Sequence, residues 1–127
     1  MGQPVAGRAW PSRIFATGAI LSLLLFTGCA GTPERNAYRV IGTTATTVDA
    51  AMKVWATHVA AGKASAADEL KVNFAYAKYQ NAARVVEAGV RSYRSNPADA
   101  TALERALATL EAVRLEVLQL VYGLTAP

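Results

Sequence analysis

Few side chains in this sequence are of a type that performs catalysis or binds a metal. The chain contains one histidine, His58, and one cysteine, Cys29. A structural zinc site needs about four nitrogen or sulfur ligands, which this sequence does not supply. A serine–histidine–aspartate arrangement would have to use His58, which lies beside an apolar stripe and is interpreted as a packed histidine. The acidic residues have basic neighbours at helical spacing, as in solvated helix pairs. We therefore predict no catalytic residue, no metal site and no cofactor.

The cysteine closes an apolar segment near the start of the chain. Residues 1–13 contain two arginines and no acidic residue, and residues 14–26 read IFATGAILSLLLF without a charge. A basic start, a short apolar run and small residues at its end are typical of a secretory signal peptide. The run is short for a transmembrane helix, which needs about 20 residues. A retained membrane helix over residues 14–30 is the alternative.

The segment Leu25-Phe26-Thr27-Gly28-Cys29 resembles a bacterial lipobox, the signal of small bacterial lipoproteins, although Phe26 stands where leucine is usual. The resemblance implies that Cys29 becomes the first residue of the mature protein and that its thiol and amine receive acyl chains such as palmitate. Because Ala30 rather than aspartate follows, it also implies outer-membrane anchoring facing the periplasm, in preference to the inner membrane. We expect a signal peptide over residues 1–28 and a lipidated tether over residues 29–35.

The first predicted helix covers residues 33–61. Its apolar residues alternate in spacings of three and four, which place them in one stripe of a helix. Gly62 supplies the end of the pattern. Four threonines between residues 43 and 47 lower the helix propensity. Because Thr46 and Asp49 have the spacing of a capping box, a later helix start is the alternative.

Two further helices are predicted from strong start signals. Ser65-Ala66-Ala67-Asp68 is a capping box that precedes a helix over residues 66–94. Asn96-Pro97-Ala98-Asp99 places a cap residue before a proline, which predicts a third helix over residues 98–122. Connections of a few residues favour antiparallel neighbours. The predicted fold is therefore all-α, an antiparallel three-helix bundle over residues 36–124 that follows the tether.

The second predicted helix carries two apolar stripes on nearly opposite sides. One contains Tyr76, Tyr79 and Tyr93, and the other begins with Leu70 and Phe74. A helix that is apolar on two sides needs partners on both, so it either lies in the middle of the bundle or offers one stripe to another molecule. Aromatic residues with a polar group at the tip are common at interfaces that are partly exposed to solvent, which makes the three tyrosines candidate interface residues. A core with hydroxyls at its edge is the alternative.

Arg114 is the fourth candidate interface residue, because it falls within the apolar sector of the third predicted helix. Three alternatives are open. Its guanidinium reaches solvent from the rim of the apolar face, pairs with an acid of another helix such as Asp49 or Glu87, or contacts a partner, because arginine is enriched at interfaces.

The charge balance excludes one class of partner. The sequence has 13 Lys and Arg, 9 Asp and Glu and a net charge of +4 at pH 7. Arg8 and Arg13 of the leader account for half of that excess, and the remaining +2 is too small to indicate nucleic-acid binding. We therefore expect a membrane-anchored cell-envelope lipoprotein that binds or scaffolds without catalysis, with a protein partner or a second copy at its second helix. Small helical lipoproteins of this kind occur in bacterial genomes and prophage regions.

Two other functions are alternatives to that expectation. Helical bundles hold apolar molecules between their helices, so a surplus apolar face is also consistent with a periplasmic carrier of a lipid or small apolar ligand. The third alternative is a small enzyme that uses glutamate side chains or His58, which would require a perturbed pKa at one of these groups.

Overall fold

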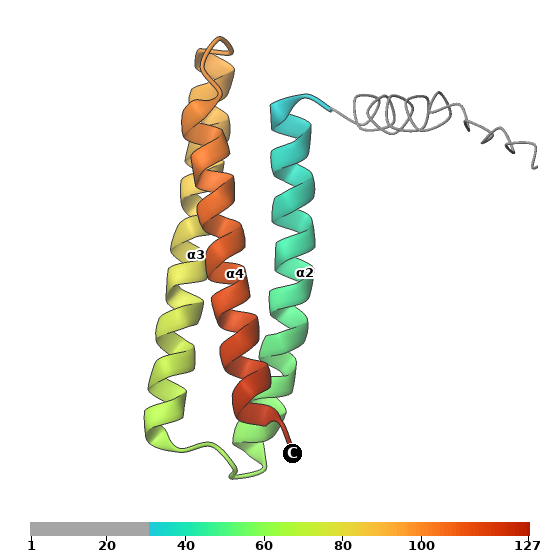
Figure 1. Ribbon diagram of the computed structural model, residues 1–127, viewed down its shortest axis with the longest axis vertical. Coiled ribbons are helices and arrows are strands. Elements are labelled where there is room, and N and C mark those ends of the chain that lie inside the picture. Colours follow the sequence, from blue (N-terminus) through green and yellow to red (C-terminus); the bar gives the residue numbers. More distant parts are fainter. Residues whose placement is uncertain (1–30) are drawn as a thin grey trace, which may run out of the picture. The chain divides into compact units, whose positions relative to one another are not determined.

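The computed structural model describes residues 31–127, so the predicted signal peptide and the predicted lipidation site Cys29 lie outside the described residues. Its helices are α2 (Pro33–Ala60), α3 (Ala66–Ser95) and α4 (Thr101–Thr125), and this range contains no strand. α2 and α4 run in one direction and α3 runs in the other (Figure 1). The predicted all-α three-helix bundle is confirmed.

α2 begins where the sequence predicts, within the segment expected to be a tether. The Thr32 side chain accepts a hydrogen bond from the backbone N–H of Arg35 at 3.3 Å, and Pro33 takes the first helical position, where no partner for its nitrogen is needed. The alternative start at Thr46 is wrong. The Thr46 hydroxyl donates to the carbonyl of Gly42 at 3.0 Å, so this threonine is held inside the helix.

The connection from α2 to α3 uses one glycine and one serine. Gly62 has a φ of 70°, a left-handed conformation that glycine adopts without strain and that ends α2. Ser65 then caps α3: its Oγ accepts the backbone N–H of Asp68 at 3.1 Å and donates to Asp68 Oδ2 at 2.6 Å. The predicted capping box is therefore present, and α3 ends one residue beyond the predicted 66–94.

α4 begins and ends three residues later than the predicted range of 98–122. Asn96 ends α3, where its N–H donates to the carbonyl of Ser92 at 3.0 Å, and Pro97 lies in the following turn. The side chain of Asp99 accepts the N–H of Thr101 at 3.0 Å and so precedes the first turn of α4. The prediction of a cap at Asn96 is wrong because asparagine and proline suit a turn as well as a helix start.

α4 is the helix that packs along both others, whereas α2 and α3 contact each other little. Its large buried residues Leu103, Leu110 and Val117 recur seven apart. Small residues recur at the same interval on its neighbours and let the larger α4 side chains approach. These small residues are Ala37, Thr44 and Ala51 on α2, and Ala75, Ala82 and Gly89 on α3. The middle position in the bundle therefore belongs to α4, which leaves one side of α3 without a covering helix.

Candidate interaction surface

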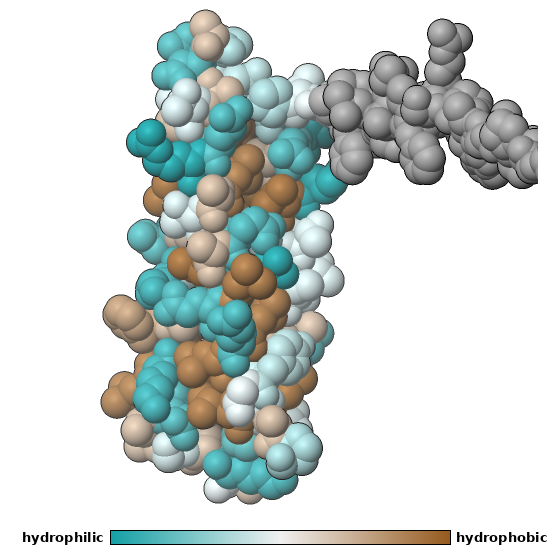
Figure 2. Space-filling view, in the orientation of Figure 1, coloured by the Kyte–Doolittle hydropathy of each residue, from teal (hydrophilic) through white to brown (hydrophobic). Residues whose placement is uncertain are grey.

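α3 exposes the second of its two apolar stripes. Leu70 is 72% exposed, Phe74 is 68% exposed and Val85 is 50% exposed. We call these three residues the outer row of α3. Figure 2 shows hydrophobic side chains projecting among hydrophilic ones at the edge of the bundle where α3 lies. Because the buried residues of α3 point to the opposite side, the outer row is open to another molecule.

A lysine lies beside the most prominent ring of this row. Lys78 Nζ is 5.9 Å from the centre of the Phe74 ring and forms an ion pair with Glu116 of α4, at 2.6 Å from Oε2. The ion pair is exposed and adds little to folding stability. It does hold a cation over the Phe74 ring, which orders the polar edge of the outer row.

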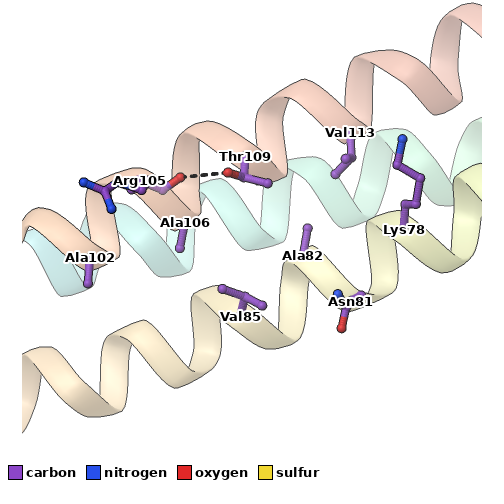
Figure 3. Close-up of a pocket in the computed structure, with 9 residues that line it drawn as sticks. All are labelled: Lys78, Asn81, Ala82, Val85, Ala102, Arg105, Ala106, Thr109 and Val113. Atoms are coloured by element: carbon purple, nitrogen blue, oxygen red, sulfur yellow. Dashed lines mark hydrogen bonds between the residues drawn. The ribbon is translucent and has the colours of Figure 1, made fainter.

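A groove of about 420 Å³ lies between α3 and α4. In Figure 3, Ala82 of α3 and Ala102 and Ala106 of α4 point into the space between the two helices. The short alanine side chains leave this space unfilled. Val85 lines the groove and belongs to the outer row, so the two surfaces are continuous. The lining residues are Lys78, Asn81, Ala82, Val85, Ala102, Arg105, Ala106, Thr109 and Val113.

The tyrosine stripe of α3 is the inward one. Tyr79 is 7% exposed and belongs to the core, and Tyr76 and Tyr93 are half-buried against it. The rings of Tyr76 and Tyr79 stack with centroids 6.1 Å apart. The three tyrosines therefore lie in the core or at its edge, which is the alternative to an interface role. The exposed surface of α3 is the outer row. Its signal in the sequence is weak because Asn81 and Lys78 interrupt it.

Arg114 pairs within its own helix. Its Nε donates to Glu111 Oε2 at 2.8 Å, and its side chain is 23% exposed. The acids named from the sequence, Asp49 and Glu87, do not form an ion pair with it in the described part of the chain. Glu111 has a partly exposed side chain and belongs to the same helix. This pairing fits the alternative in which the Arg114 guanidinium reaches solvent from the rim of the apolar face.

His58 is half-buried and stacks on Trp55, with ring centroids 5.6 Å apart. This contact agrees with a packed histidine. Within residues 31–127, no three His, Cys, Asp or Glu side chains gather in a way that would hold a metal ion. None of the helices in the same range combines the length and the hydropathy that crossing a bilayer requires.

A polar cluster joins the start of α2 to the end of α3, where the helices otherwise touch little. Arg94 Nε donates to Glu34 Oε1 at 2.7 Å, and the same guanidinium donates to the hydroxyl of Tyr38 at 3.1 Å. The hydrogen bond and the negative charge of Glu34 raise the pKa of Arg94. The cluster closes that end of the bundle, so it is a structural contact between helices.

Comparison of this chain with protein-family models, with curated proteins and with solved structures finds no match.

Proposed function

We propose that this protein is a membrane-anchored lipoprotein of the cell envelope that binds a protein partner through the outer row of α3. The observation that supports the binding role is the exposure of Leu70 and Phe74 on a helix whose other side is packed. Covering a leucine or phenylalanine side chain stabilises a complex by roughly 1.5–3 kcal/mol. A partner that buries both side chains gains several kcal/mol before the cost of association is subtracted.

The start of α2, which follows the proposed anchor in the sequence, and Leu70 and Phe74 of the outer row lie toward opposite ends of the described bundle. α2 begins four residues after Cys29, so the start of the bundle would stay within about 14 Å of the acylated cysteine. α3 runs opposite to α2, so Leu70 and Phe74 are near the far end of the bundle. The 28 residues of α2 span about 42 Å. A bundle that extends away from the proposed anchor would present Leu70 and Phe74 to partners away from the membrane surface.

The binding role is tested by photo-crosslinking in cells. A photoreactive amino acid at position 74 is compared with the same amino acid at position 115, because Leu115 is an exposed apolar residue of α4 outside the outer row. We expect one defined crosslinked product from position 74, its loss on Leu70→Ser, and no product from position 115. A product with the mass of two copies would identify the partner as this chain. Equal products from both positions, or none from position 74, would refute the binding role.

The anchoring is tested separately by the intact mass of the protein extracted from membranes. We expect a mass equal to residues 29–127 plus acyl groups, and a Cys29→Ala variant that carries no acyl group and leaves the membrane fraction. An unprocessed or unacylated mass of the unchanged protein would contradict the anchoring while leaving the crosslinking result untouched.

A further inference from the structure

We propose that the groove between α3 and α4 binds a free fatty acid, with its carboxylate at Arg105 and its alkyl chain along the alanines. The groove adjoins the outer row, with which it shares Val85, but it differs from that row in shape and lining. It is concave, alanine and valine side chains form most of its lining, and Lys78, Asn81, Arg105 and Thr109 are its polar lining residues. This combination is the usual form of a small-molecule site. The proposal goes beyond the protein-binding role and does not depend on it.

The floor of the groove fits one alkyl chain. Ala82, Ala102 and Ala106 face the space, and Val85 and Val113 line its sides (Figure 3). From residue 102 to residue 113, α4 rises by about 16 Å, which is enough for a chain of medium length. The volume of about 420 Å³ lies in the lower part of the usual range for ligand sites, which suits one chain.

The charges at the two ends of the groove are not equivalent. Lys78 is already neutralised by Glu116, with Nζ at 2.9 Å from Oε1 and 2.6 Å from Oε2. Arg105 is exposed and forms no ion pair with any residue of 31–127. Figure 3 places Arg105 beside Ala102 and Lys78 beside Val113, so the unneutralised cation is at one end of the floor.

A carboxylate is the head group that this end favours. The guanidinium offers two parallel N–H donors that match the two oxygens of a carboxylate. The hydroxyl of Thr109 donates to the carbonyl of Arg105 at 3.1 Å, so it is satisfied within α4 and does not compete for the head group. The alkyl chain then runs from Arg105 toward Val113, over alanines that have no polar side-chain atom.

The test measures dodecanoate binding to residues 32–127 by calorimetry, because this segment is one compact unit that contains the whole described core. Dodecanol, with the same chain and no charge, is the reference ligand. We expect one dodecanoate per chain, bound about tenfold more tightly than dodecanol. Arg105→Gln should remove this preference, whereas Arg91→Gln, at another exposed arginine without an ion pair, should keep it.

A second pair of variants tests the floor. Ala102→Leu places a larger side chain in the groove, and Ala108→Leu adds the same atoms at an exposed position of α4 outside it. We expect Ala102→Leu to weaken dodecanoate and dodecanol at least about tenfold, with an unchanged melting temperature, and Ala108→Leu to bind both normally. Equal affinity for the two ligands, a retained preference in Arg105→Gln, or normal binding by Ala102→Leu would overturn the proposal. Tighter binding of a lysophospholipid than of dodecanoate would also overturn it.

Discussion

Gly89 of α3 lies directly against Leu103 of α4. A Cβ atom at position 89 would be 3.4 Å from both Cα and Cδ1 of Leu103, which is ordinary van der Waals contact. The space at this crossing therefore accepts one methyl group. Because Leu103 is itself buried, this contact determines how closely the C-terminal part of α3 and the N-terminal part of α4 approach each other (Figure 1).

Gly89→Ala is expected to stabilise the fold by about 0.5–1 kcal/mol, because glycine inside a helix is less favourable than alanine by about that amount. Gly89→Leu is expected to destabilise it by about 1–3 kcal/mol through overpacking. Urea unfolding followed by circular dichroism measures both. Gly42→Ala is the matched control, since no atom lies within 4 Å of its added Cβ. If Gly89→Ala lowered the free energy of unfolding while Gly42→Ala raised it, α3 and α4 would have to pack more closely at this crossing than the structure shows.

Tyr79 and Phe74 should respond oppositely to truncation because they lie on different sides of α3. Tyr79→Ala removes a buried ring and is expected to lower the free energy of unfolding by about 3 kcal/mol. Phe74→Ala removes an exposed ring and is expected to change it by less than about 0.5 kcal/mol. Chemical denaturation of the two variants checks the assignment of the stripes. If both variants lost a similar amount of unfolding free energy, α3 would have to be covered on both sides.

Ser65→Ala should weaken the start of α3 in a way that depends on pH. The hydrogen bond from Ser65, followed by the interaction with Lys71, lowers the pKa of Asp68. A carboxyl whose pKa is lower in the folded state stabilises the fold above its unfolded pKa of about 3.9, and this contribution is lost as the pH falls through the folded value. Loss of the cap itself is expected to cost about 1 kcal/mol near neutral pH.

The difference in unfolding free energy between the unchanged protein and Ser65→Ala should therefore be constant above about pH 5 and decrease below about pH 4. An NMR titration should show the pKa of Asp68 rising toward its ordinary value in the variant. Ser92→Ala, at an exposed serine inside α3, is the control. A difference that persists unchanged at low pH would show that the cap acts through the backbone alone.

The helix boundaries were predictable where a local signal had one meaning. Thr32 before Pro33 and Ser65 before Asp68 each form the hydrogen bond that their spacing predicts. At Asn96 the same reasoning failed, because a residue that caps a helix also fits the turn that ends the previous one. The threonines between residues 43 and 47 lower the helix propensity but do not end α2, because the hydroxyls of Thr44, Thr46 and Thr47 donate to carbonyls of the same helix.

The candidate site was less predictable than the helices. Periodicity indicates two apolar stripes on α3 but not which of them is covered. The sequence therefore favours the tyrosines as interface residues, whereas the exposed surface is the outer row of Leu70, Phe74 and Val85. The groove had no signal in the sequence at all. It exists because Ala82 on one helix and Ala106 on another meet across an interface, and such a meeting has no fixed spacing along the chain.

By itself, the sequence determined that the chain forms three amphipathic helices, because caps and apolar spacing act within one or two turns. Tertiary structure decided that α4 occupies the middle position, that Tyr79 lies in the core and that Phe74 lies outside it. The physical reason is that the side chains facing each other on two helices set how closely the helices pack. Rows of small residues on α2 and α3 let α4 pack closely against both, and only the assembled bundle shows which apolar surface is left uncovered.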